Sequence, residues 1–168
     1  MPDSSELYDE WISALNEHDE NRLAACFSPD GVMVTPQCVV EGREQIAWYF
    51  QQFFSAFGDF GITVTRRFSC EDGIVAEWRV TGTHTGQLLL PGGTEASRSD
   101  RRISVDGVAA YTMEGGRFVT GRIYYDQMQI YGAIGSRVSR VSPDHRLPDG
   151  KGEALRDDLP RRRDTPGV

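Results

Sequence analysis

The chain has 168 residues, 39% of them hydrophobic and 26% charged, which is typical of one globular domain that buries its own core. A net charge of −7 disfavours a nucleic-acid partner, because an acidic surface repels the phosphate backbone. No apolar run approaches the ~20 residues of a membrane-spanning helix, so no membrane partner is expected either.

Charge divides the chain into a body and a tail. Residues 137–168 hold eight Arg or Lys and six Asp or Glu, a balance of +2, so residues 1–136 hold 10 basic and 19 acidic side chains, or −9. From residue 136 onward Pro, Asp, Arg and Gly dominate, without apolar periodicity. We therefore predict one domain over residues 1–135 and a disordered tail over residues 136–168.

The cysteines and the N-terminus indicate the compartment. Cys26, Cys38 and Cys70 are odd in number and have no CxxC spacing, which disfavours disulfides and zinc. The first residues lack the basic start and apolar stretch of a secretory signal. These features predict a cytoplasmic protein without a bound metal.

The first half of the chain is predicted to be mainly helical. An apolar stripe at i, i+4 and i+8 predicts a helix over residues 4–17, with Ser4 or Ser5 as its N-cap. Asp19 can cap a short second helix. A turn at residues 28–31 and a strand at residues 32–35 follow.

A third helix is predicted over residues 43–57. It carries six aromatic side chains, more than one buried stripe can hide, which is consistent with the wall of a cavity. These side chains are Trp48, Tyr49, Phe50, Phe53, Phe54 and Phe57.

From residue 61 the apolar period changes to two. Four strands are predicted, at residues 62–68, 74–85, 103–113 and 118–129. Helices followed by long antiparallel strands indicate an α+β fold, in which a curved, mostly antiparallel sheet wraps the N-terminal helices.

Two polar residues lie within these apolar strands and are the candidate catalytic pair. In the strand predicted at residues 74–85, alternation places Trp78 and His84 on the same face, with His84 near the end of the strand. In the last predicted strand, Asp126 shares a face with Tyr124 and Met128. Burial between an aromatic ring and a thioether is expected to raise the pKa of the Asp126 carboxyl. One residue as base and the other as acid could transfer a proton at a carbon next to a carbonyl, without metal or cofactor.

Structural roles compete with this interpretation. His84 near a strand end can be a structural histidine, and Asp126 can pair with Arg122, Arg79 or a helix N-terminus. Trp78 and Tyr124 can equally be core residues. The candidate substrate contacts are Trp78, Tyr124, Trp48, Phe53, Met33 and Arg79.

The chain resembles the SnoaL-like polyketide cyclase family of the nuclear transport factor 2-like superfamily, whose members are conical α+β barrels. Six segments carry the resemblance in order and together span about residues 5–135. They are Trp11 with residues 15–19 (LNEHD), residues 27–31 (FSPDG), 41–44 (EGRE), 57–59 (FGD), 82–86 (GTHTG) and 122–126 (RIYYD).

The resemblance implies roles for specific residues. In the cyclases an Asp on the last strand serves as acid/base for an intramolecular aldol ring closure with a His nearby, which corresponds to Asp126 and His84 here. It also implies no cofactor and a homo-oligomer, dimer or tetramer, packed through the sheet. The family includes members that only bind or that isomerise or hydrolyse, so the fold alone does not select an activity.

The sequence departs from the family at two places. Residues 90–94 (LPGGT) replace a Pro-Thr-Gly turn common after the His-containing strand. Related limonene-type epoxide hydrolases use an Arg and an Asp two residues apart; Arg79 matches the Arg, but Thr81 stands at the Asp position. Thr cannot supply the charge, which disfavours epoxide hydrolysis, and alternation places Arg79 on the face opposite His84.

Three functions remain at this stage. The first is a cofactor-independent cyclase or isomerase acting on a small, largely apolar activated-carbonyl substrate. The second is a non-catalytic module that binds a hydrophobic molecule or serves assembly. The third is a hydrolase that uses the same pocket.

Overall fold

The computed structural model describes residues 3–90 and 93–136. The helices are α1 (Ser4–Asn16), α2 (Glu20–Cys26), α3 (Gly42–Ala56) and α4 (Gln127–Ile134). The strands are β1 (Phe27–Val34), β2 (Val39–Glu41), β3 (Gly61–Cys70), β4 (Gly73–Thr83), β5 (Leu88–Leu89), β6 (Glu95–Ala96), β7 (Arg102–Glu114) and β8 (Arg117–Tyr125). The predicted tail at residues 136–168 lies, except for its first residue, outside the described residues.

The three predicted N-terminal helices are confirmed, with local sequence fixing their starts. Asp3, rather than Ser4 or Ser5, caps α1: its side chain accepts a hydrogen bond from the Glu6 backbone N–H, and the Glu6 side chain accepts one from the Asp3 N–H in return. Asp19 caps α2 as predicted, accepting from the Arg22 N–H at 3.0 Å.

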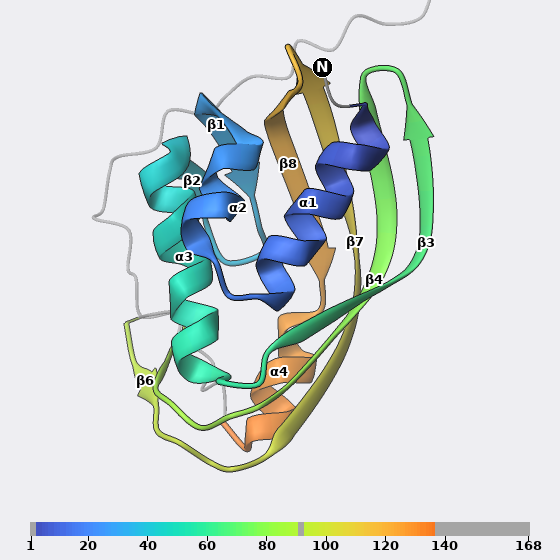
Figure 1. The fold of residues 1–168 in the computed structure, drawn as a ribbon. Coiled ribbons are helices and arrows are strands. Elements are labelled where there is room, and N and C mark those ends of the chain that lie inside the picture. Colours follow the sequence, from blue (N-terminus) through green and yellow to red (C-terminus); the bar gives the residue numbers. More distant parts are fainter. Residues whose placement is uncertain (1–2, 91–92, 137–168) are drawn as a thin grey trace, which may run out of the picture. The chain divides into compact units, whose positions relative to one another are not determined.

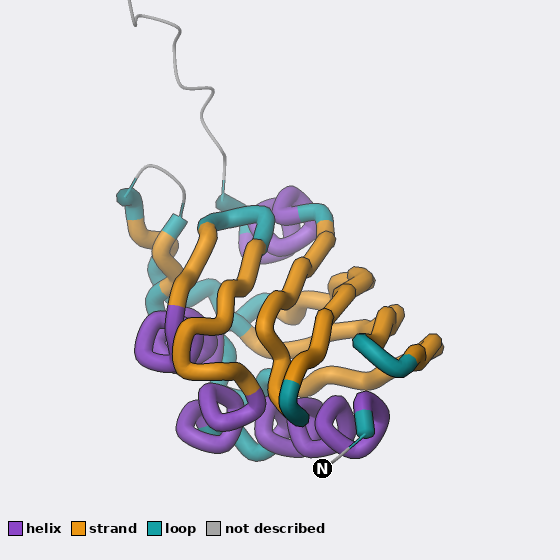
Figure 2. Tube along the Cα trace, turned by 90° about the horizontal axis from the view of Figure 1, so that it is seen from above, coloured by secondary structure: helices purple, strands orange, loops and turns teal. Residues whose placement is uncertain are grey.

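Six strands form one sheet in the order β2-β1-β8-β7-β4-β3. All neighbouring pairs are antiparallel except β1 with β8, which is parallel and pairs Val34 with Arg122. The sheet curves around α1, α2 and α3, which lie along one side of it (Figures 1 and 2). The predicted α+β fold is confirmed.

Two local predictions about the strands were wrong, and one short strand pair was missed. Residues 28–31 are an irregular stretch within β1, where the register shifts between Phe27 and Val32, rather than a turn. The last predicted strand, residues 118–129, ends at Tyr125 and is followed by α4. The short pair β5–β6 was not predicted, because two-residue strands carry no periodicity.

The core lies between the helices and the concave face of the sheet. Trp11 of α1 contacts aromatic rings from α3 and from the sheet, at centroid distances of 5.2 Å to Phe50 and 5.4 Å to Phe27. Such edge-to-face contacts add about 0.5–1.5 kcal/mol each to the burial of the rings. No helix among the described residues is both long and apolar enough to span a membrane.

Candidate ligand-binding cavity

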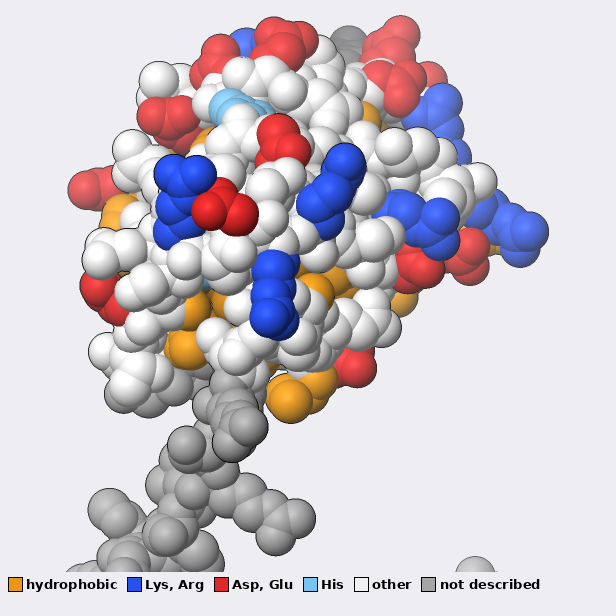
Figure 3. Space-filling view, turned by 90° about the horizontal axis from the view of Figure 1, so that it is seen from below, with side chains coloured by type: hydrophobic (Ala, Val, Ile, Leu, Met, Phe, Trp, Pro, Cys, Tyr) orange, Lys and Arg blue, Asp and Glu red, His pale blue; other side chains and the backbone are white. Residues whose placement is uncertain are grey.

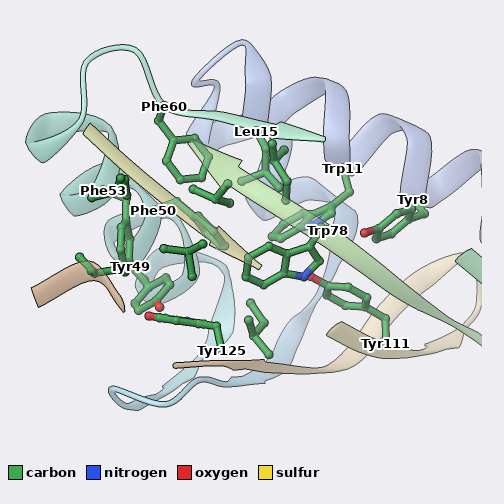
Figure 4. A pocket seen from close by; sticks show the side chains of 16 residues that line it. Tyr8, Trp11, Leu15, Tyr49, Phe50, Phe53, Phe60, Trp78, Tyr111 and Tyr125 are labelled. Carbon is green, nitrogen blue, oxygen red and sulfur yellow. The ribbon is translucent and has the colours of Figure 1, made fainter. Parts of the chain in front are cut away.

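A cavity lies between the helical layer and the sheet (Figure 4). It contains about 630 Å³ of empty space, its opening toward solvent included. Sixteen side chains line it: Tyr8, Trp11, Leu15, Tyr49, Phe50, Phe53, Phe60, Ile62, Trp78, Val80, Ile103, Val105, Tyr111, Ile123, Tyr125 and Ile130.

Periodicity within each element directs these side chains inward. On α1, Tyr8, Trp11 and Leu15 recur at helical spacing on the buried face. On the strands, alternation points Trp78 with Val80, Ile103 with Val105, and Ile123 with Tyr125 toward the helices.

A glycine makes room for one of the large rings. Gly107 of β7 lies directly beneath Trp78, and a Cβ at this position would come within 2.3 Å of the indole Cη2 atom. Gly107 sits in regular register with β4, directly opposite Trp78. Gly107 therefore allows the Trp78 indole to lie flat against the sheet.

The lining carries no charged side chain. None of the 16 described lining residues is Asp, Glu, His, Lys or Arg. The polar side-chain groups that the lining residues carry are the hydroxyls of four tyrosines and the indole N–H groups of Trp11 and Trp78. The cavity is thus apolar with a few neutral hydrogen-bonding groups.

Burial keeps the tyrosines of the wall protonated. It raises the pKa of Tyr49 to about 12 and raises the pKa values of Tyr8, Tyr111 and Tyr125 as well. At neutral pH these four phenols are therefore uncharged and can donate hydrogen bonds.

Two tyrosine hydroxyls meet at one end of the cavity (Figure 4). The Tyr49 Oη donates to the Gln37 Oε1 at 3.1 Å. Burial and the neighbouring Tyr49 phenol raise the pKa of the Tyr125 hydroxyl beside it, so this end of the cavity holds two protonated phenols side by side.

A surface groove adjoins the cavity. Tyr49 and Phe53 of α3 line both. Trp48 and Gln52, one position before them on the helix, line the groove only, and Leu89 lies across from them. The inward face of α3 thus lines the cavity, and the adjacent face of the same helix lines the groove.

The structure separates the six predicted substrate contacts. Trp78 and Phe53 line the cavity, and Trp48, 51% exposed, lines the groove. Met33 is fully buried in the core and lines neither. Tyr124 and Arg79 point away from the cavity, on the outer face of the sheet.

Arg79 is occupied by an ion pair on that outer face. Its guanidinium donates to both carboxylate oxygens of Asp106, at 2.7 and 3.0 Å. Arg79 therefore does not line the cavity described here. Its predicted place opposite the face of His84 is confirmed.

His84 is fully buried but lies outside the cavity wall. Its Nδ1 is 3.0 Å from the Ser99 Oγ, its ring packs on Phe57, and its Nε2 has no partner within the described residues. Burial lowers the pKa of His84, and nearby Asp100 partly opposes this.

Asp126 does not have the buried setting expected for it. Its side chain is exposed and caps α4, accepting a hydrogen bond from the Met128 N–H at 2.9 Å. Its expected neighbours Tyr124 and Met128 are 57% and 55% exposed. The structure therefore does not bring Asp126 and His84 together at the cavity, because β8 ends one residue before Asp126.

Sequence reasoning missed three of the four tyrosines of the wall, Tyr8, Tyr111 and Tyr125. In the last strand, the face of Arg122, Tyr124 and Asp126 was predicted to be buried, whereas Ile123 and Tyr125 face the helices. The apolar Ile123 was the available indicator of the inner face. No group of His, Cys, Asp and Glu suited to a metal ion occurs among residues 3–90 and 93–136.

Comparison with known proteins extends these observations. The profile of the SnoaL-like domain matches residues 8–120. No match to the sequence was found among curated proteins.

Solved structures share the fold at low sequence identity. A proposed SnoaL-like polyketide cyclase from Jannaschia sp. CCS1 aligns with a TM-score of 0.68 at 19% identity, over 82% of this chain and 96% of that one. IdmH from Streptomyces antibioticus, a proposed polyketide cyclase, aligns with a TM-score of 0.65 at 19% identity, over 79% of this chain and 98% of IdmH. AclR from Streptomyces galilaeus, a proposed hydroxylase, aligns with a TM-score of 0.68 at 20% identity, over 81% of this chain and 83% of AclR.

Proposed function

Because the chain belongs to the SnoaL-like domain family, we propose that it binds a small, uncharged and largely apolar molecule in the cavity between its helices and its sheet. The observation that carries this proposal is the lining, in which aromatic and aliphatic side chains surround a few neutral donors and no charge. Concave sites lined mainly by hydrophobic and aromatic side chains, with a few polar groups, are typical small-molecule sites.

Physical chemistry favours neutral ligands here. Transfer of an aromatic ring from water into this lining gains about 25 cal/mol per Å² of apolar surface buried. A carboxylate or ammonium group would lose its hydration without meeting an opposite charge, which costs several kcal/mol or more. The site therefore selects against charged analogues of its ligand.

Tryptophan fluorescence can test the proposal, because each of the three tryptophans reports on a defined place. Trp11 and Trp78 line the cavity and Trp48 lines the groove, so the Trp48→Phe variant reports on the cavity alone. We expect neutral aromatic ketones to change the emission of this variant saturably, and carboxylated analogues not to. Val80→Phe, which fills the cavity, should abolish the response.

Val75→Phe on the outer face of the same strand is the matched control and should leave the response intact. Tight binding of the carboxylated analogues, or equal responses from the two phenylalanine variants, would contradict the proposal.

A second candidate function is cofactor-independent ring closure or isomerisation of an activated carbonyl compound. The fold shared with proteins proposed to be polyketide cyclases favours it. The phenols of the wall support it chemically, because a neutral donor can stabilise the enolate that forms when a proton leaves the carbon beside a carbonyl. Asp126 and His84 are the acid/base residues proposed from the sequence.

Deuterium uptake separates this candidate from binding alone. The protein is incubated in deuterated buffer with β-dicarbonyl and polycyclic keto-ester compounds, and mass spectrometry follows label and cyclised product. Asp126→Asn retains a capping oxygen for α4 and removes the charge, so loss of exchange in this folded variant would support catalysis by Asp126. Exchange that is unchanged in the variant rejects that role.

A further inference from the structure

We infer that the groove beside the cavity is the second half of one elongated binding site, in which the ligand places an apolar ring in the cavity and an uncharged apolar chain in the groove. This inference rests on the proposed binding function of the cavity and adds the overall form of the ligand. It is carried by the chemistry of the groove, by the exposure of its side chains and by the wall that it shares with the cavity.

The groove is as uncharged as the cavity. It contains about 690 Å³ of empty space, its opening toward solvent included. None of the described residues that line it is Asp, Glu, His, Lys or Arg, although 26% of the whole chain is charged. Its polar side chains are the amides of Gln37 and Gln52 and the thiol of Cys38. A charged group would find no opposite charge there, so the groove suits an apolar chain better.

Large apolar side chains on two sides of the groove are left in contact with solvent. Trp48 of α3 is 51% exposed and Leu89 of β5 is 47% exposed, and all three leucines of residues 88–90 line the groove. The other two tryptophans, Trp11 and Trp78, are only 1% and 7% exposed. An apolar chain lying in the groove would remove the Trp48 and Leu89 surfaces from water, which favours its binding.

The groove and the cavity have a common wall. Tyr49 and Phe53, one turn apart on α3, line both hollows, and their ring centroids are 5.2 Å apart (Figure 4). A molecule on either side of these rings therefore contacts the same two residues. The part of the ligand that joins its two ends must pass the edge of this wall, where an unbranched chain needs less space than a fused ring.

One elongated molecule is favoured over two separate ones. Two ligands would each lose translational and rotational freedom on binding, whereas a single ligand that reaches both hollows loses it once. The contacts in the groove then add to those in the cavity without a second loss of this kind.

The test compares two ketones that share a phenyl ring and a carbonyl group: acetophenone, which carries a methyl group, and octanophenone, which carries a heptyl chain instead. Equilibrium dialysis measures both affinities for the full chain. Each buried methylene strengthens binding up to about fourfold, so we expect the wild type to bind octanophenone at least about tenfold more tightly than acetophenone.

Variants of the groove show whether its side chains produce this ratio. Trp48→Ala and Leu89→Ala remove apolar surface from two different elements, and each should reduce the ratio about threefold or more. Because the two residues lie on different elements, a folding defect in one variant leaves the other as the test. Met128→Ala, at a residue that is 55% exposed and lines neither hollow, is the matched control and should keep the wild-type ratio.

The alternative results are distinguishable. If octanophenone binds no more tightly than acetophenone, or if a folded groove variant keeps the wild-type ratio, the inference is wrong and the binding function of the cavity stands. If Val80→Phe, which fills the cavity, abolishes binding of acetophenone but not of octanophenone, the groove is an independent site and the inference is wrong as well. If neither ketone, nor any neutral ketone of the fluorescence panel, binds the wild type, the proposed function fails and the inference fails with it.

Discussion

At the scale of single residues, His84 is the polar side chain most completely enclosed by the fold. Its backbone pairs with residues 100 and 101: its carbonyl accepts from the Asp100 N–H at 3.0 Å, and its N–H donates to the Arg101 carbonyl at 2.9 Å. Its imidazole has no solvent contact and packs against Phe57. Its contacts thus tie residues 99–101 to the end of β4 and to Phe57, which follows α3.

This enclosure predicts a pH dependence of stability. Burial lowers the pKa of His84 in the folded state, whereas the unfolded chain titrates near the ordinary value of 6.5. Below that pH the unfolded state binds a proton that the folded state does not, so the free energy of unfolding should decrease from about pH 6.5 downward. Denaturant unfolding between pH 8 and pH 5.5 measures the decrease.

The His84→Asn variant is the control for this titration. It retains a group that can bond the Ser99 hydroxyl but cannot be protonated, so its stability curve should be flatter over the same range. Parallel curves for wild type and variant would assign the pH dependence to other groups.

Residues also mark the limit of what the sequence could predict about the site. The inward direction of Trp78 and Phe53 follows from period two in β4 and helical period in α3. In β8, both faces carry a tyrosine, and only pairing with β7 and packing on the helices decide that Tyr125 is inside and Tyr124 outside. Asp126 was misplaced by the same ambiguity and because the predicted strand ran past Tyr125, where β8 ends and Asp126 caps α4 instead.

At the scale of elements, α4 shows why a pattern alone was not enough. Met128 and Ile130 alternate like a strand, but the buried set Ile130, Tyr131 and Ile134 has helical spacing. The capping residues, Asp126 at the start and Gly135 with φ of 79° at the end, identify this segment as a helix and not a strand.

The cap on α4 gives a prediction about Asp126. Asp126→Ala removes the acceptor for the Met128 N–H and should lower the free energy of unfolding by about 1 kcal/mol, whereas Asp126→Asn should change it little. Thermal or denaturant unfolding of the two variants gives the comparison. Equal destabilisation by both would show that the negative charge, not the capping bond, matters for the helix.

The pairing of β7 with β4 gives a prediction about Gly107. In Gly107→Ala the new methyl group would collide with the Trp78 indole and come within 2.8 Å of the Tyr124 carbonyl oxygen. We expect a loss of about 1–3 kcal/mol in stability and weaker ligand binding, because Trp78 must move into the cavity.

Gly132→Ala is the control for this substitution. Apart from its own helix backbone and chain neighbours, no described residue lies within 4 Å of its added methyl group, so helix propensity should stabilise the protein by up to about 1 kcal/mol. If both substitutions destabilise equally, the contact with Trp78 is not the cause.

At the scale of the whole molecule, the outer face of the sheet presents a row of four apolar side chains and one arginine. Val34, Arg122, Ala110, Val75 and Phe68 lie side by side on five adjacent strands. Val75 is 42% and Phe68 60% exposed. By contrast, acidic and basic side chains are mixed on the face of the molecule that Figure 3 shows.

This row gives a prediction about assembly. We expect the protein to be a homo-oligomer packed through the outer face of the sheet, because exposed apolar side chains in register can meet the same row of a second copy. Light scattering after gel filtration should give a multiple of the chain mass, and Phe68→Asp should reduce it to the monomer. A monomeric wild type at micromolar concentration would reject the prediction.

The parallel pairing of β1 with β8 also sets the order in which the fold can be completed. Phe27 pairs with Phe118, so the ladder closes only after almost all described residues have been synthesised. Contacts between such distant segments raise contact order and slow folding. A ribosome-bound chain that lacks β8 presents β1 and β7 with unpaired backbone groups, and such edges can pair with other chains until the last strand arrives.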